Sequence, residues 1–221
     1  MVIEKQTFEN VKSIGSHRVV SGLELIRCQF VGGSLSQHDD PSFGLIVRDV
    51  VARRCSFKRV VCGGVRFDTV LGENLTSTVT RLAGCALRHV TLRGRAGSLM
   101  LVPPNFSLAE EMQAAFAAGL LDFYAGVDWA LDITEAEFDD ADLYYLPGDL
   151  VRHDPETQFV LRRSALANAD TTDLPPFARI AVSRFDASPF DALIAVAPKR
   201  SKDFAERLAH YRELRDRKIA D

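Results

Sequence analysis

The chain has 221 residues, of which 47 % are hydrophobic and 26 % are charged. These values exclude an intrinsically disordered chain and suit one large domain, or one domain with an appendage. The formal net charge of −3 says nothing about partners on average, so the distribution of charge along the chain matters more.

Targeting signals and metal-binding motifs are not found in the sequence. The first ten residues contain no apolar run typical of a signal peptide, and no apolar stretch is long enough to span a bilayer. We therefore expect a cytoplasmic protein that does not associate with a membrane. The four cysteines form no CxxC pair and have no zinc-ligand spacing with histidine, so we expect buried, reduced thiols and no metal. They are Cys28, Cys55, Cys62 and Cys85.

Apolar residues recur at every fifth position in the first half of the chain. Nine of the ten residues reached in steps of five from Leu45 to Val90 are apolar, and a second series with the same spacing starts at Val47. A helix repeats after about 3.6 residues and a strand after 2, so neither keeps this phase. A chain that turns a corner every five residues keeps this phase. The period predicts a mainly β fold, a quadrilateral β-helix with about twenty residues per coil and about 4.8 Å between coils.

A helix is expected to interrupt the β-helix. Pro103 and Pro104 end the first repeat block, and the sequence from Ser107 to Glu110 matches a capping box. The helix would begin at Leu108 and stop at Gly119, which makes an insertion near residues 107–119. Such a helix would cover an edge of the coils or plug their bore.

A second repeat block runs from Leu121 to Leu150, with its phase shifted by one residue. Its segments Ala136-Glu137-Phe138-Asp139-Asp140 and Ala141-Asp142-Leu143-Tyr144-Tyr145 resemble the pentapeptide-repeat family, whose unit reads Ala-Asp/Asn-Leu-x-x. The resemblance covers about residues 30–150 and implies that the quadrilateral β-helix is right-handed. Elsewhere the Asp/Asn position holds mostly Arg, Val or Ser, so we expect irregular coils. An antiparallel β-sandwich or another type of β-helix is the alternative. The expected inward pairs are Leu121/Phe123, Gly126/Asp128, Leu131/Ile133, Ala136/Phe138, Ala141/Leu143 and Leu146/Gly148.

Residues 151–221 are expected to form a C-terminal α/β extension that packs on the solenoid of residues 1–150. Two strands flank a turn at Asp154, a polar loop covers 168–176, and short strands are expected at 177–182 and 192–196. Ser201 would cap a closing helix over 202–218. Its apolar stripe packs on the solenoid or meets a partner. The stripe consists of Phe204, Leu208, Tyr211 and Leu214.

Charge is segregated along the chain. Residues 45–95 hold ten Arg or Lys and three acids, whereas residues 96–151 hold eleven acids and neither Arg nor Lys. On stacked coils these acids would form a rigid array that attracts a basic partner. The alternative is a solvated face that keeps the protein soluble. We do not expect nucleic acid as a partner of the basic segment, because Phe57 and Phe67 fall on inward positions.

These observations predict a non-enzymatic protein-binding scaffold without catalytic residues or cofactors. The first hypothesis is a bacterial immunity-type protein that neutralises a basic, nuclease-type toxin through the acidic face. The family resemblance implies an alternative, a DNA-mimicking protein that acts on type II topoisomerase. A β-helix carbohydrate-active enzyme is the second alternative, and the oligomeric state is open. The predicted partner-binding residues are Asp128, Trp129, Asp132, Glu135, Glu137, Asp139, Asp140, Asp142, Tyr144 and Tyr145.

Overall fold

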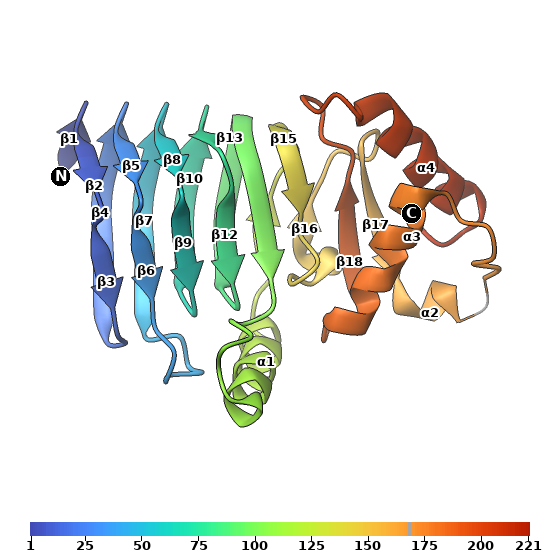
Figure 1. The fold of residues 1–221 in the computed structure, drawn as a ribbon, viewed down its shortest axis with the longest axis horizontal. Coiled ribbons are helices and arrows are strands. Elements are labelled where there is room, and N and C mark those ends of the chain that lie inside the picture. The colour runs from blue at the N-terminus through green and yellow to red at the C-terminus, as the bar shows by residue number, and fades with distance from the viewer. Residues whose placement is uncertain (168) are drawn as a thin grey trace.

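The fold is mainly β and is built from parallel strands that stack along one axis. The computed structural model describes residues 1–167 and 169–221. Its largest sheet has 12 strands and is curled, because the long strand β13 (Ala86–Val102) belongs to two neighbouring faces. Successive coils run from the N-terminus at one end to a mixed α/β region at the other (Figure 1). This arrangement is that of a β-solenoid.

The strands of the coils form three columns, and the second column ends at β11, before the last coils. The first column contains β1 (Val2–Glu4), β4 (Arg18–Ile26), β7 (Leu45–Arg53), β10 (Arg66–Glu73), the start of β13, β14 (Leu131–Asp132) and β16 (Val151–Arg152). The second contains β2 (Thr7–Glu9), β5 (Gln29–Val31), β8 (Ser56–Lys58) and β11 (Thr76–Ser77). The third contains β3 (Lys12–Ile14), β6 (Ser34–Ser36), β9 (Val60–Gly63), β12 (Thr80–Ala83), the end of β13, and β15 (Ala136–Asp142).

The five-residue period has a cause in the backbone. Val50, Val70 and Val90 are paired in register, so these coils take twenty residues each. Within them a left-handed residue directly precedes an inward side chain at nearly every fifth position, and so marks the corners. The left-handed residues that do so, with φ between +53° and +61°, are Asp49, Arg54, Arg59, Gly64, Thr69, Asn74, Gly84 and His89. Gly94 is left-handed as well, but Arg95 after it is exposed.

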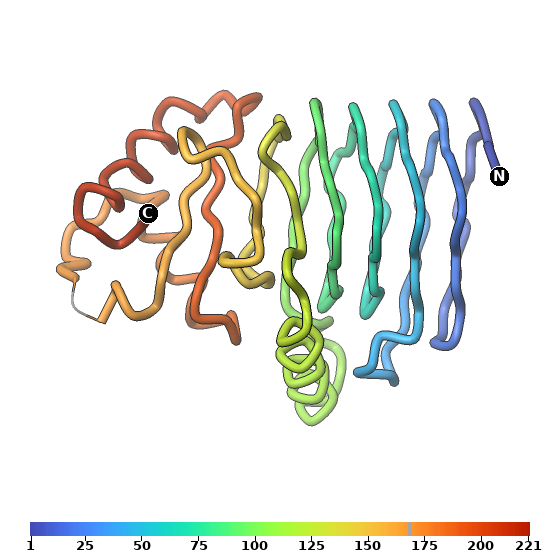
Figure 2. Tube along the Cα trace, turned by 180° about the vertical axis from the view of Figure 1, so that it is seen from behind, coloured from blue at the N-terminus to red at the C-terminus, as the bar shows by residue number. Residues whose placement is uncertain are grey.

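Side chains fill the interior of the coils. Phe8, Phe30 and Phe57 form a ladder, with ring centroids 5.0 and 5.1 Å apart along the axis. Cys28 and Cys55 are fully buried one coil apart. All four cysteines are buried and free, and burial raises the pKa of the Cys62 thiol to about 12. From behind, the coils form a continuous stack (Figure 2).

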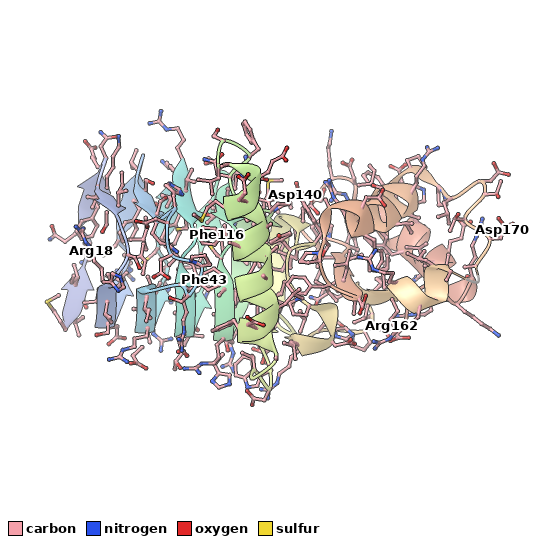
Figure 3. The ribbon with its side chains drawn as sticks, turned by 90° about the horizontal axis from the view of Figure 1, so that it is seen from below. Arg18, Phe43, Phe116, Asp140, Arg162 and Asp170 are labelled. Atoms are coloured by element: carbon pink, nitrogen blue, oxygen red, sulfur yellow. The ribbon has the colours of Figure 1, made fainter. Side chains whose placement is uncertain are left out.

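Two insertions leave the solenoid at the same corner, after the third column. One is the loop 37–44 and the other contains helix α1 (Glu110–Tyr124). They contact each other, since the rings of Phe43 and Phe116 lie 5.7 Å apart and both side chains are buried (Figure 3). The insertions therefore cover this corner together.

Helix α1 differs from the expected one at both ends. Ser107 does not cap it, because the N-cap residue is Ala109 and no side chain caps the helix. Gly119 does not end it, because this glycine serves a tertiary contact. A β-carbon there would lie 2.3 Å from the carbonyl oxygen of Pro41. The expected inward pair Leu121/Phe123 is also wrong, because the helix continues past Gly119 and contains both residues.

The second repeat block is regular only from Leu131 onward. Leu131, Ile133, Phe138 and Leu143 are fully buried, as the period predicted. The pair Gly126/Asp128 is exposed instead, because the chain there is still returning from α1 to the coils.

Beyond Arg152 the chain forms an α/β region around the antiparallel pair of β17 (Gln158–Arg162) and β18 (Ala192–Val196). β16 and β17 do not form a hairpin, because β16 pairs with β14 of the solenoid. The other elements are η1 (Gly148–Leu150), α2 (Arg163–Leu166), α3 (Pro176–Ser183), η2 (Arg184–Ala187) and α4 (Phe204–Asp216).

Two expectations for this region need correction, and a third falls partly outside the residues that the structure describes. The strand expected at 177–182 is part of helix α3, because Pro176 opens a helix and the residues that face inward have helical spacing. The α4 stripe packs within the extension rather than on the coils, and the Tyr211 ring lies 5.9 Å from Phe159. Asn168, the first residue of the expected polar loop, lies outside the described residues. No helix in the described ranges has the length and apolar character needed to cross a bilayer.

Candidate functional site

The ten predicted residues fall into three places. Asp128, Trp129, Asp132 and Glu135 lie around β14, in the segment that returns from α1 to the coils. The other acids, Glu137, Asp139, Asp140 and Asp142, lie on β15. The two tyrosines follow β15 directly.

Trp129 is half-buried between two side chains from neighbouring coils. The His89 ring centroid lies 4.7 Å from that of the indole, and the Arg152 guanidinium carbon lies 4.2 Å from it. His89 comes from the coil before Trp129 and Arg152 from the coil after it. The contacts hold the indole in one orientation, so its exposed part is presented by a rigid support.

A shallow groove leads along the outside of the first column from Asp49 to Trp129. Its floor includes Val51, Leu71 and Thr91, which are paired in register on β7, β10 and β13. Asp132 continues this series as the register partner of Thr91. An apolar strip thus ends at an aromatic side chain and a carboxylate.

Two further acids lie beside Trp129 and Asp132, where the groove ends. Asp128 is exposed and lies 2.6 Å from Nε2 of His89, and this hydrogen bond lowers the pKa of the Asp128 carboxyl. Glu135 is exposed as well and lies 3.7 Å from Nε of Arg93, a residue of the groove wall. Asp132 accepts hydrogen bonds from the backbone and hydroxyl of Thr134, at 3.1 and 2.9 Å. We call Asp128, Trp129, Asp132 and Glu135 the groove end.

The acids of β15 have a different role, because arginines of the same chain bind them. Asp139 accepts hydrogen bonds of 3.0 Å from both Arg95 and Arg200. Burial opposes the ionisation of Asp139, but these bonds outweigh it and lower the pKa. Glu137 lies 3.9 Å from Arg200. The β15 acids thus fasten the extension to the last coils.

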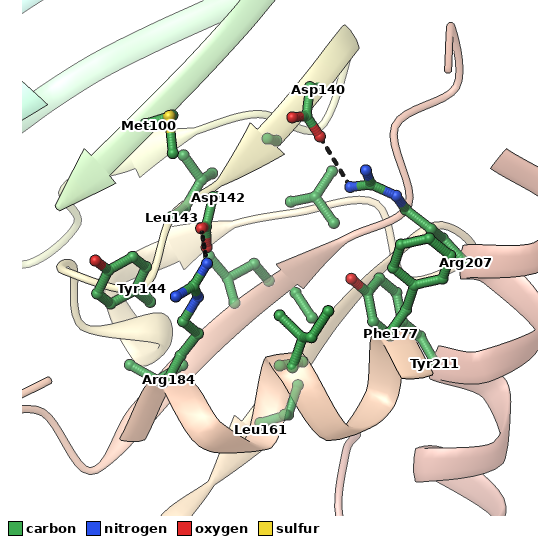
Figure 4. Close-up of a pocket in the computed structure, with 17 residues that line it drawn as sticks. Met100, Asp140, Asp142, Leu143, Tyr144, Leu161, Phe177, Arg184, Arg207 and Tyr211 are labelled. Atoms are coloured by element: carbon green, nitrogen blue, oxygen red, sulfur yellow. Dashed lines mark hydrogen bonds and ion pairs between the residues drawn. The ribbon is translucent and has the colours of Figure 1, made fainter. Parts of the chain in front are cut away.

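A cleft of about 260 Å³ is lined by residues of β15, α3, α4 and β18 (Figure 4). Arg184 reaches across it to Asp142, at 2.5 Å, and Arg207 to Asp140, at 2.8 Å. Burial raises the pKa of Asp142, and nearby Asp140 raises it further while Arg184 opposes the shift. A carboxyl with a raised pKa in a cleft is typical of a catalytic acid. Here each carboxylate is bound to an arginine, which is the arrangement of a structural ion pair.

The tyrosines do not extend the groove end. Tyr145 is buried against Phe190, with ring centroids 6.1 Å apart, and burial raises the pKa of its hydroxyl to about 12. Tyr144 lies in the cleft, 4.6 Å beneath the Arg184 guanidinium. Neither ring is available to a partner as an open aromatic surface.

Sequence reasoning missed most of the groove. His89 and Arg152, which orient Trp129, come from other coils. The floor residues Val51, Leu71 and Thr91 stand twenty positions apart, so the coil length itself was a signal for them. The cleft arginines had no such signal, because the extension does not follow the five-residue period.

Within residues 1–167 and 169–221, no group of three or more His, Cys, Asp or Glu side chains is arranged to hold a metal ion. Comparison of the chain with family models, with curated proteins and with solved structures finds no match. The functional argument therefore depends on the geometry of this surface.

Proposed function

We propose that the chain is a non-enzymatic scaffold that binds a basic protein through the groove end. The observation that carries the proposal is that an apolar groove ends where Trp129 meets three carboxylates, those of the exposed Asp128 and Glu135 and the half-buried Asp132. A fixed aromatic group beside an apolar strip is typical of the energetic centre of a protein interface. Carboxylates at its rim steer a positively charged partner.

The proposed contact surface excludes most of β15. Asp139, Asp140 and Asp142 are held by arginines, so a partner would have to break these ion pairs to reach them. At the groove end no arginine donates a hydrogen bond to a carboxylate: Asp128 contacts His89 at 2.6 Å, Asp132 bonds only to Thr134 among the interactions described, and Arg93 lies 3.7 Å from Glu135. Its strands are rigid, which keeps the entropy cost of binding low.

The specific role that we propose is that of an immunity-type protein in the cytoplasm, with a nuclease-type toxin as its basic partner. Free, buried cysteines favour a reducing compartment.

We also propose that the solenoid is a right-handed, four-sided coil of the pentapeptide-repeat kind. The left-handed corner at nearly every fifth residue and the twenty-residue coils support this.

A capture experiment tests the proposal. The 221-residue chain is immobilised and incubated with source-cell lysate at low salt, and a captured basic protein is purified. Its Kd is then measured with the wild type and with Trp129→Ala and Asp132→Asn. We expect about tenfold weaker binding for each variant, and inhibition of the partner's nuclease activity by the wild type. Asp122→Asn is the control, because Asp122 is an exposed acid of α1 outside the groove. Capture of no basic protein, or equal binding by all variants, contradicts the proposal.

A further inference from the structure

The two ends of the solenoid are finished differently. At the C-terminal end the extension bonds to the last coils, where Gln158 Nε2 and the Arg200 amide donate to the carbonyls of Ile133 and Phe138, both at 3.0 Å. At the other end β1, β2 and β3 are the outermost strands of their columns. In the described chain each of them pairs on one side only. Their free edges can accept another strand.

The open end also leaves apolar side chains in contact with water. Phe8 is the last ring of the aromatic ladder and stacks on Phe30 alone. Val2, Val11 and Ile14 are 57 %, 54 % and 60 % exposed. A free strand edge and an exposed apolar rim together call for a cover, because both are unfavourable in water.

We propose that a second copy of this chain covers the open end, in a two-fold symmetric, head-to-head dimer. A two-fold axis reverses the direction of the partner's strands, so the edges pair antiparallel. With the axis passing beside Phe8, β2 pairs with β2 of the second copy, and β1 pairs with β3 of the second copy. The aromatic ladder then continues from one Phe8 ring to the other.

Charge complementarity selects this register. It sets Glu4 opposite Lys12 of the second copy and Val2 opposite Ile14, and the symmetry repeats both pairs. All four side chains are exposed and stand on the outer face of their strands. Ile3 and Ser13, which face inward, also meet each other. The interface is therefore self-complementary, as a two-fold contact requires.

Other positions of the axis lose this match. An axis beside β1 sets Glu4 opposite Val2, and Lys5 opposite the charged amino group of Met1. An axis beside β3 sets Lys12 opposite Ile14. These registers pair a charge with an apolar side chain or with a like charge, both unfavourable in a sheet, and gain no pair of opposite charges. The register through Phe8 also sets Lys5 opposite Val11, but it gains two pairs of Glu4 with Lys12.

Sedimentation equilibrium of the 221-residue chain tests the dimer. The wild type is expected at twice the chain mass of 24.4 kDa. Lys12→Glu and Glu4→Lys each create two like-charge contacts per dimer, and we expect each to raise the dimer Kd by about tenfold. The double variant Glu4→Lys/Lys12→Glu exchanges the charges and is expected to restore the wild-type Kd. Lys58→Glu is the matched control, because Lys58 is an exposed strand lysine away from the open end.

Each alternative result has a defined meaning. A wild type that is monomeric at about 100 µM overturns the dimer. A dimer that tolerates both single reversals overturns the proposed register, as does a double variant that stays dissociated while each single variant remains folded by circular dichroism. The groove end lies toward the other end of the solenoid, so partner capture and dimerisation are tested separately.

Discussion

Arg184 of η2 crosses the cleft to Asp142 of β15, and its guanidinium donates a 2.5 Å hydrogen bond to the half-buried carboxylate. The same guanidinium covers the ring of Tyr144 at 4.6 Å. One side chain of the extension thus neutralises an acid and packs on an aromatic ring of the solenoid. This contact is the clearest single link between the two parts of the chain.

Removal of this arginine should loosen the extension. Arg184→Met leaves the Asp142 charge without its cation in a partly buried place, and we expect a loss of about 1–2 kcal/mol in the free energy of unfolding. Urea denaturation at pH 7 measures it. Arg179→Met is the control, because Arg179 is exposed on α3. Equal stability of the two variants would show that the pair contributes nothing.

Asp40 should make stability depend on pH in the acid range. Burial opposes its ionisation, but hydrogen bonds from Ser16, Ser42 and Gly44 outweigh burial and lower its pKa from 3.8 to about 2. Because the folded pKa lies below the unfolded one, the stabilisation is complete above about pH 4 and disappears as pH falls through 2. We expect Asp40→Asn to cost about 1 kcal/mol at pH 7. Urea midpoints measured between pH 7 and 2.5 should converge, and parallel curves would disprove this.

Gly119→Ala should destabilise the chain although alanine is the better helix former. Alanine gains about 1 kcal/mol of helix propensity, but its β-carbon would lie 2.3 Å from the Pro41 carbonyl oxygen. We expect a net loss of about 1–2 kcal/mol, read as a lower melting temperature. Gly126→Ala is the control, since nothing lies within 4 Å of a β-carbon there. A melting temperature at or above that of the wild type would refute the close contact.

Thr69→Asn should stabilise the chain. Thr69 is exposed at a corner with φ of +55°, where a β-branched side chain is strained and asparagine is tolerated. Relief of this strain is expected to add about 0.5–1 kcal/mol to the free energy of unfolding. Chemical denaturation measures the free energy of unfolding of Thr69→Asn. Thr78→Asn is the control, because Thr78 lies outside the left-handed corners. A gain in both variants would point to a cause other than the backbone.

The solenoid was predictable because its signal is local and repeated. Val50, Val70 and Val90 each follow a left-handed corner, so the same environment selects the same kind of side chain in every coil. Gly119 was wrongly predicted to end the helix, because a glycine is needed there for the close approach of Pro41, which lies far away in the sequence. The strand expected at 177–182 failed because a short apolar segment fits a helix as well as a strand.

The candidate site was predictable only in part. The acidic run identified Asp128, Asp132 and the neighbouring Trp129, but composition gives no information on which acids have partners in the fold. Asp140 and Asp142 meet Arg207 and Arg184 only after the extension folds back on β15. Pairing of this kind depends on tertiary structure and leaves no periodic trace.

The shared exit corner of the two insertions limits how this chain can change in evolution. The coils between them turn at Gly64 and Gly84, and β-carbons there would lie 2.6 Å from the Gln37 carbonyl oxygen and 2.9 Å from Pro104. Phe43 comes from one insertion and Phe116 from the other, so deletion of either insertion alone would leave one of these buried rings without the ring it packs against. The loop and the helix therefore depend on each other, and we expect the loss of one alone to expose the buried phenylalanine of the other.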